Sequence, residues 1–304
     1  MKLIKEQLNI DFLGKRRLAG VVSSLLIVAG IVSYFALGGL HYGIDFTGGT
    51  LVQVRFEEAL EIEEFRTLLS QKSPVAFSLQ SFGEEDTREF LITLSQGDAK
   101  QTDAQENPAV WVEDLLKETH PKHTIRRVES VGPKVGEELK ESAFLAILLS
   151  LLLILLYIWV RFQWRYGIGA IVALFHDVLI VLGAFVITQK EISLPVVAAI
   201  LTVAGYSIND TIVIFDRLRE NLRRYRKRDV ADVMNESINQ TLSRTILTSG
   251  TTLFVLLSLY IFGGDIINDF AFALLIGVVV GTYSSIFIAS PTLHLLMQRA
   301  KQSA

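Results

Sequence analysis

Two adjacent polar residues, Asn209 and Asp210, lie inside an apolar stretch from Ile192 to Phe215 that is long enough to cross a lipid bilayer. A carboxylate at membrane depth costs about 3 kcal/mol or more, so it is rarely present without a function. A helix that ended one turn earlier would instead leave Asp210 among the lipid headgroups. Apolar residues 212–215 still follow before the first charge, and the sequence therefore favours a carboxylate inside the membrane.

An arginine at the start of the next apolar stretch is a candidate to face Asp210. Arg244 is followed at helical spacing by Thr248 and Thr251, so the three residues form one polar stripe. A guanidinium offsets the cost of a buried carboxylate, and a carboxylate released from it can take up a proton. Arg244 could equally be a residue that snorkels to the membrane surface. Its spacing does not decide between the two interpretations.

The apolar stretch before that of Asp210 carries His176 and Asp177 near its middle. Asp177 is a second carboxylate that is costly at this depth, whereas His176 has a simpler interpretation as a packed imidazole hydrogen-bonded to a neighbour. A carboxylate that alternates between charged and protonated states can relay protons, so proton transfer is the chemistry that these residues indicate. The sequence contains no phosphate-binding loop, metal-ligand cluster or nucleophile triad, and we expect neither an enzyme nor ATP hydrolysis.

Six apolar stretches must position these residues. Half of the chain is hydrophobic and the mean hydropathy is +0.41, which is typical of a membrane protein and excludes an ordinary soluble domain. The chain has no cysteine, so disulfides and thiolate metal sites are impossible. Gly277 and Gly281 in the last stretch are expected to be a helix-packing surface. We predict spanning helices over residues 18–38, 141–160, 166–187, 192–215, 244–264 and 268–297.

Basic residues predict the orientation of these helices, because loops rich in lysine and arginine remain in the cytoplasm. Three consecutive basic residues, 15–17, stand before the first helix, and segment 217–228 contains seven basic residues against one acid. Segments 188–191 and 263–269, on the opposite side, carry a single lysine. The chain is therefore expected to begin and end in the cytoplasm.

The cytoplasmic segments are expected to contact the membrane surface. They comprise residues 1–17, 216–243 and 298–304. Residues 230–242 have the pattern of an amphipathic helix that lies on the inner surface. Attraction to the lipid bilayer explains the basic charge, and no nucleic acid is expected, because Tyr225 is the only aromatic residue among these charges.

Residues 39–140, between the first two helices, are predicted to form an external α+β domain. The expected elements are a strand over 49–56, a helix over 61–71, strands over 76–82 and 88–95 joined at 83–86, a linker over 96–108, a helix over 110–119 and a strand over 123–131. The order βαββαβ is that of a ferredoxin-like split unit. The predicted fold class is a polytopic α-helical membrane protein with six transmembrane helices and a small ferredoxin-like domain.

Glycine-rich junctions connect this domain to the membrane helices. Gly48 and Gly49 lie in a turn that needs backbone conformations open mainly to glycine. Gly132, Pro133 and Gly136 lie at the second junction, where Pro133 suits the first position of a helix that continues into the membrane. Both junctions could act as hinges, although glycine only permits such motion.

Several motifs together resemble the SecF family of bacterial protein-export membrane proteins. They are Gly43-Ile-Asp-Phe-Thr-Gly-Gly-Thr50, Gly132-Pro-Lys-Val-Gly136, His176-Asp-Val178, Gly205-Tyr-Ser-Ile-Asn-Asp-Thr-Ile-Val213 with Asp216-Arg217, and Arg244-Thr-Ile-Leu-Thr-Ser-Gly-Thr-Thr252. The likeness covers essentially the whole chain. It implies a member of the SecD/SecF family, within the RND superfamily, in the bacterial inner membrane.

The resemblance also implies a function and partners. Such a subunit works with SecD beside the SecYEG channel, in the company of YajC and YidC, and uses the proton-motive force to promote preprotein movement into the periplasm. The external domain would be periplasmic. Asp210 would be the protonatable carboxylate and Arg244 its partner, with Asn209 and Asp177 beside the pathway. No cofactor is implied other than the coupling ion, which is expected to be a proton, although some relatives use sodium.

Two other functions compete with a proton-driven export subunit. A structural subunit that only stabilises its partner would have no need for Asp210 at membrane depth. An RND-type exporter of small molecules or lipids would need a larger external pocket than one small domain provides.

Overall fold

The computed structural model describes residues 9–58, 60–73, 75–82, 88–94 and 108–302. The chain divides into two compact units. A helical unit comprises Met1–His41, Ala146–Glu191 and Pro195–Ala304, and a sheet unit comprises Tyr42–Leu145 and Ile192–Leu194.

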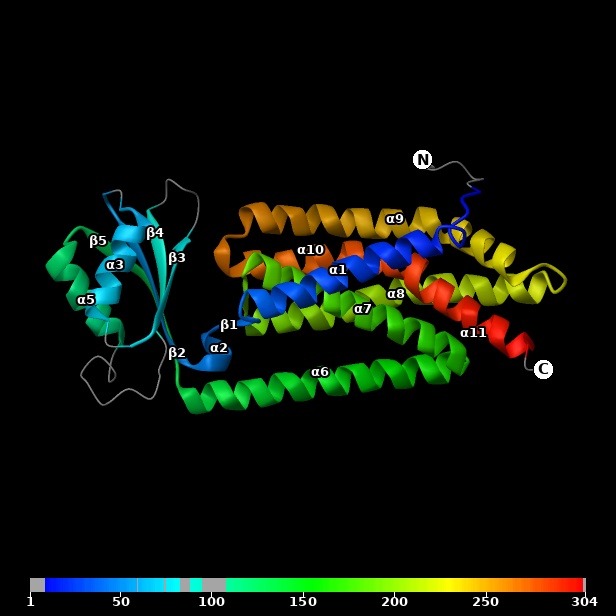
Figure 1. Ribbon diagram of the computed structural model, residues 1–304, viewed down its shortest axis with the longest axis horizontal. Coiled ribbons are helices and arrows are strands. Elements are labelled where there is room, and N and C mark those ends of the chain that lie inside the picture. The colour runs from blue at the N-terminus through cyan, green and yellow to red at the C-terminus, as the bar shows by residue number, and fades with distance from the viewer. Residues whose placement is uncertain (1–8, 59, 74, 83–87, 95–107, 303–304) are drawn as a thin grey trace. The chain divides into compact units, whose positions relative to one another are not determined.

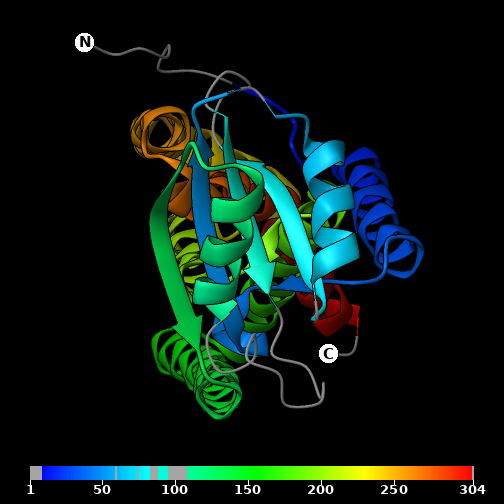
Figure 2. The same cartoon turned by 90° about the vertical axis from the view of Figure 1, so that its left-hand side faces the viewer.

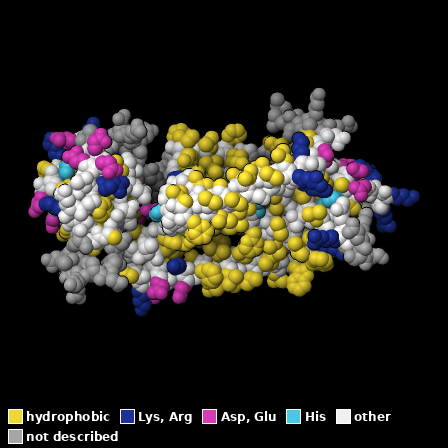
Figure 3. Space-filling view, viewed as in Figure 1, with side chains coloured by type: hydrophobic (Ala, Val, Ile, Leu, Met, Phe, Trp, Pro, Cys, Tyr) yellow, Lys and Arg dark blue, Asp and Glu magenta, His cyan; other side chains and the backbone are white. Residues whose placement is uncertain are grey.

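Six helices of the described chain are long and apolar enough to cross a membrane, as the sequence predicts (Figure 1). They are α1 (Arg16–Ala36), α6 (Pro133–Arg161), α7 (Trp164–Thr188), α8 (Leu194–Arg224), α9 (Val230–Phe262) and a last span over Ile267–Ala300. Apolar side chains cover the helices along their length, and basic side chains gather where α1 begins and α11 ends (Figure 3). Such a surface suits lipid around the middle of the helical unit and water at its end.

The last span is interrupted. It consists of α10 (Asp265–Ser284), a π-helical segment η1 (Ser285–Ala289) and α11 (Ser290–Gln302). Pro291 explains the interruption, because proline has no N–H to donate to the carbonyl of Phe287 and its ring crowds that carbonyl. The wider π turn accommodates both effects.

The prediction of a loop over residues 216–243 with its own surface helix is wrong. α8 continues to Arg224, and α9 begins at Val230 and runs without a break into the fifth span. Leu218 on α8 and Met234 on α9 are both fully buried. The apolar face that a separate surface helix would turn toward lipid is used instead within the core of the helical unit.

The sheet unit has the ferredoxin-like arrangement that the sequence predicts. Its elements are β2 (Gly49–Phe56), α3 (Ile62–Lys72), β3 (Phe77–Phe82), β4 (Glu89–Leu94), α5 (Pro108–Thr119) and β5 (His123–Val131). The strands form an antiparallel sheet in the order β3-β4-β2-β5, and α3 and α5 lie on one of its faces (Figure 2). The predicted connection 83–86 lies outside the described residues, as does the predicted linker except for Pro108, which begins α5.

Alternation along the two central strands explains the core of this unit, because every second side chain of a strand points to the same face. The alternating residues are all nearly or fully buried: Val52, Val54 and Phe56 on β2, and Phe90, Ile92 and Leu94 on β4. They form one cluster with Phe65 of α3 and Leu116 of α5. Each such side chain stabilises the fold by about 1.5–3 kcal/mol on burial.

Candidate functional site

Asp210 lies on α8 with 3% of its surface exposed. Its Oδ2 atom accepts hydrogen bonds from Ser249 Oγ on α9 at 3.4 Å and from Thr282 Oγ1 on α10 at 3.3 Å. The two hydroxyl oxygens are 2.7 Å apart, so one hydroxyl donates to the other, and only the second can donate to a charged Asp210 at the same time. Hydroxyls donate to a carboxylate and accept from a carboxylic acid, so this surrounding serves Asp210 in either protonation state.

Close packing of α8 against α10 brings these groups together. A Cβ atom built on Gly277 would lie 2.1 Å from Val203 Cγ2, and one built on Gly281 would lie 2.9 Å from Ser207 Cβ. Only glycine leaves room for such a crossing without displacing the opposite helix. The predicted packing role of this glycine pair is confirmed.

Asp177 on α7 is the centre of a second cluster and is fully buried. Its Oδ2 atom accepts hydrogen bonds from Ser207 Oγ on α8 at 2.5 Å and from Ser284 Oγ on α10 at 2.8 Å. Its Oδ1 atom lies 2.9 Å from His176 Nδ1, and His176 Nε2 lies 2.9 Å from Ser23 Oγ on α1. The prediction of a packed, hydrogen-bonded His176 is confirmed, and the cluster connects four helices.

Arg244 and Asn209 do not join these clusters, because both lie on the exposed surface of the helical unit. The expected ion pair between Asp210 and Arg244 is absent from the described part of the chain. Thr248, from the predicted polar stripe, is also exposed and donates to Arg244 O of its own helix at 3.0 Å. Neighbouring residues lie about 100° apart around a helix, and Ser249 is the one that faces Asp210.

The sequence pattern does not identify the hydroxyl residues of α8 and α10 that contact the two carboxylates. Thr282 directly follows the packing residue Gly281, Ser284 lies three residues after it, and Ser207 lies almost one turn before Asp210. The position of these hydroxyls beside the glycine crossing or beside Asp210 could therefore have identified them. A hydroxyl next to a close helix crossing has the geometry to reach a polar group on the opposite helix.

The glycines of the two junctions pack against each other inside the sheet unit. Gly48 has a φ of +68°, and a Cβ atom there would lie 2.9 Å from Pro133 Cα. Gly49 has a φ of +135°, and a Cβ on Gly136 would lie 3.1 Å from Gly48 N. Gly132 has open space around it. Close approach or backbone conformation thus explains Gly48, Gly49 and Gly136, but not Gly132.

A carboxylate beside the first junction caps a membrane helix. Asp45 lies in the short helix α2 (Ile44–Thr47), and its Oδ2 accepts a hydrogen bond from the backbone N–H of Leu194 at 2.9 Å. Leu194 is the first residue of α8. Gly43 N also donates to Ile192 O at 2.9 Å. These contacts join the motif around Gly48 to residues 192–194 within the sheet unit.

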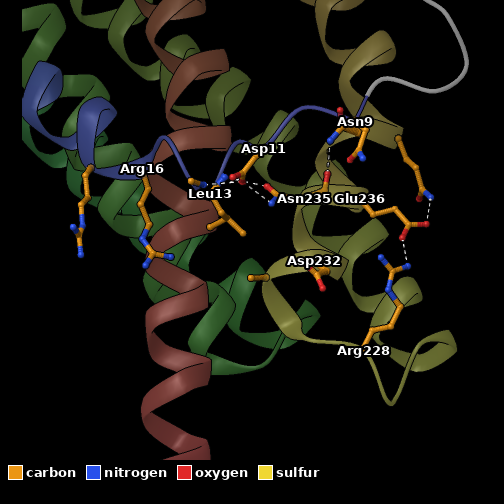
Figure 4. A pocket seen from close by; sticks show the side chains of 13 residues that line it. Asn9, Asp11, Leu13, Arg16, Arg228, Asp232, Asn235 and Glu236 are labelled. Carbon is orange, nitrogen blue, oxygen red and sulfur yellow. Dashed lines mark hydrogen bonds and ion pairs between the residues drawn. The ribbon is translucent and has the colours of Figure 1, made fainter.

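A polar hollow of about 950 Å³ lies where the segment before α1 meets the start of α9 (Figure 4). Asn235 Oδ1 accepts from the N–H groups of Phe12 and Leu13 at 3.1 and 3.0 Å, and Asn235 Nδ2 donates to Asp11 at 2.8 Å. The backbone N–H of Gly14, followed by Asn235, holds the pKa of Asp11 below its usual value. These contacts dock the N-terminal segment on α9.

No group of three or more potential ligands in the described residues could hold a metal ion.

Two families of known proteins match this chain. Residues 111–299 match the family described as "Protein export membrane protein SecD/SecF, C-terminal", and residues 35–59 match "SecD/SecF GG Motif". The protein translocase subunit SecF of Vibrio alginolyticus is 46% identical over 289 residues, which are 95% of this chain and 90% of that protein. The SecF subunit of Calditerrivibrio nitroreducens is 45% identical over 306 residues, which are 99% of each.

Solved structures show the same architecture. The crystal structure of SecDF from Thermus thermophilus superposes with a TM-score of 0.84 at 39% identity, over 98% of this chain and 40% of that one. A second SecDF structure, in a super-membrane-facing form, gives a TM-score of 0.71 at 39% identity, over 100% of this chain and 40% of that one. The chain thus spans about two-fifths of the SecDF chains that it matches.

Proposed function

The chain belongs to the SecD/SecF family of protein-export membrane proteins, and from this premise we propose that it is a SecF-type translocase subunit that couples proton movement to preprotein export. The observation that carries the proposal is the buried Asp210, which is held by hydroxyls from two other helices and has no cation bound to it in the described chain. A carboxylate in such surroundings can bind and release a proton while its hydrogen bonds persist.

The likeness to SecDF supports a SecD-type partner, since the matched chains are longer than this one. We propose that this partner covers the surface on which Asn209 and Arg244 are exposed. Asp210, Arg244, Asn209 and Asp177 then form the proposed proton pathway. The wider assembly would include the SecYEG channel, YajC and YidC.

The apolar helices and the SecF relatives support a multi-pass membrane location. We propose the bacterial inner membrane, with both termini in the cytoplasm, because the basic segments favour that orientation. The sheet unit would then lie in the periplasm, where it could act on emerging preproteins.

The test compares Asp210→Asn with Asp216→Asn. Asp216 is a carboxylate on the same helix, but its side chain is 42% exposed and is paired with Arg161 at 3.0 Å. Each variant is reconstituted with SecD and the channel in proteoliposomes, and preprotein translocation is measured with and without a proton gradient. We expect Asp210→Asn to abolish the gradient-dependent part while the complex assembles normally. Asp216→Asn should retain that part.

Arg244→Met extends the test to the proposed partner of Asp210, and we expect it to reduce both proton flux and gradient-dependent translocation. Normal gradient-dependent export by Asp210→Asn would refute the proton role and leave a structural subunit. Proton-driven transport of a drug or lipid, without any effect on preproteins, would indicate an exporter instead.

A further inference from the structure

We propose that His176 and Asp177 form a second proton-binding site and together hold one proton more than a neutral imidazole and a carboxylate contain. The pair ends a continuous chain of polar contacts. Tyr283 Oη donates to the backbone carbonyl of Ala19 at 2.7 Å and lies 3.0 Å from Ser23 Oγ. Ser23 Oγ lies 2.9 Å from His176 Nε2, and His176 Nδ1 lies 2.9 Å from Asp177 Oδ1.

The number of hydrogens in this chain carries the proposal. A carbonyl can only accept, so the single hydrogen of Tyr283 is committed to Ala19. The contact between Tyr283 and Ser23 therefore requires the single hydrogen of Ser23. Ser23 then has none left for His176, and His176 Nε2 must carry a hydrogen and donate it.

The last contact needs a further hydrogen. A neutral imidazole has only one N–H, which is already placed on Nε2. The 2.9 Å contact between His176 Nδ1 and Asp177 Oδ1 must then contain another hydrogen, either on the imidazole or on the carboxyl group. In both arrangements the pair has no net charge. A fully buried pair is expected to prefer such a state, since an uncompensated charge there is costly.

The groups that face the pair do not compensate a negative charge. Besides Ser23 on α1, they are Ser207 on α8 and Ser284 and Tyr283 on α10, and none of these side chains is a cation. The charged group closest along α8 is Asp210, three residues beyond Ser207, and its sign is also negative. No arginine or lysine of the described chain pairs with Asp177. The extra proton is thus the compensating charge.

Release of this proton would leave one contact in the chain without a hydrogen. This series of polar contacts connects α7 through Ser23 on α1 to Tyr283 on α10. The protonation state of the pair is therefore tied to the contact between these helices. A role for this link in the export cycle rests on the proposed function. The presence of the proton does not, because it follows from the hydrogen bonds alone.

The experiment is NMR of the full chain in lipid nanodiscs with labelled histidine and aspartate, with signals assigned through His176→Gln and Asp177→Asn. At neutral pH we expect either an imidazolium signal from His176 or a protonated carboxyl signal from Asp177. A neutral imidazole together with a charged carboxylate would overturn the proposal.

Tyr283→Phe provides the sharper test, because it removes one contact and one hydrogen acceptor. Ser23 is then free to donate to His176, and the chain no longer needs the extra proton. We expect the imidazolium signal of His176 or the protonated carboxyl signal of Asp177 to be lost at neutral pH in this variant. Tyr206→Phe is the matched control, since Tyr206 donates to Thr252 elsewhere on the unit. Equal behaviour of the two variants would refute the proposal.

Asp210→Asn separates this inference from the proposed function. We expect it to leave the signals of the pair at neutral pH unchanged, even though gradient-dependent export is lost. If export persisted in Asp210→Asn while the pair still held its proton, the proposed role of Asp210 would fail and the second proton site would stand.

Discussion

Gly281→Ala should destabilise the helical unit by forcing α8 away from α10. The added Cβ would lie 2.9 Å from Ser207 Cβ and 3.2 Å from its Cα. Carbon atoms normally approach to about 3.5–4.0 Å, so the helices must separate locally by roughly 0.5 Å or more. Overpacking of this kind costs about 1–3 kcal/mol.

The same displacement should disturb polar contacts across the crossing. Thr211 Oγ1 and Ser285 Oγ, one helical turn farther along both helices, are 2.8 Å apart. A separation of about 0.5 Å would lengthen that contact past the distance that hydroxyl hydrogen bonds prefer and would weaken it. We therefore expect Gly281→Ala to lower the free energy of unfolding by about 3 kcal/mol, the upper end of the range for overpacking alone.

The assay is equilibrium unfolding of the purified chain in mixed detergent micelles, with Gly205→Ala as the control. Gly205 is also in a spanning helix, but nothing lies within 4 Å of the Cβ it would gain. Alanine there should be neutral or stabilise by up to about 1 kcal/mol, since glycine is a poor helix former. Equal free energies of unfolding for Gly281→Ala and Gly205→Ala would refute the close crossing.

Three further changes test the junctions and the N-terminal segment. Gly48→Ala should lower the free energy of unfolding of the sheet unit by about 1 kcal/mol or more, because the φ of Gly48 is +68° and the added Cβ would meet Pro133. The control Gly132→Ala should be neutral in the same thermal unfolding experiment. Asp45→Ala removes the cap of α8 and should cost about 1 kcal/mol, seen as faster hydrogen exchange at the start of that helix. The pKa of Asp11 is lower in the folded chain than its usual value of 3.8. Ionised Asp11 therefore stabilises the docked N-terminal segment at pH values above 3.8, and this stabilisation is lost as the pH falls through the lower pKa of the folded chain. An NMR titration should show this midpoint moving up in Asn235→Ala, and an unchanged midpoint would contradict the role of that side chain.

The two carboxylates could be found from the sequence because their cost in lipid does not depend on which way the helix faces. Asp210 and Asp177 are conspicuous in any apolar stretch, and both are buried. Their ligands depend on helix phase, which apolar patterns determine poorly in lipid, where the outer face of a helix is apolar too. The stripe of Arg244 and Thr248 therefore lies on the exposed face of α9, and Ser249, one position after Thr248, is the residue of this helix that contacts Asp210.

The error over residues 216–243 has a different physical origin. A dense run of basic residues after a membrane span indicates a cytoplasmic segment, but it does not indicate that the helix ends. No glycine or proline occurs between Asp216 and Arg224, so nothing in the chain stops α8 at the membrane surface. The prediction equated the limit of the apolar stretch with the limit of the helix. The fully buried Leu218 shows that packing continues past it.

If Asp210 binds a proton as proposed, the position of Arg244 suggests how that proton would act on a helix. Hydroxyl ligands such as Ser249 adjust to either protonation state by rotating, so they need not move the backbone when the proton leaves. A guanidinium differs, because it is attracted to a carboxylate and not to a carboxylic acid. Arg244 lies on α9 five residues before Ser249, about 7.5 Å along the helix axis, and is exposed. A charged Asp210 would therefore favour any displacement of α9 that brings Arg244 closer, and a neutral Asp210 would not. This difference between the two states is what a proton-driven motion requires, since a ligand shifts a conformational equilibrium only when it interacts unequally with the two conformations.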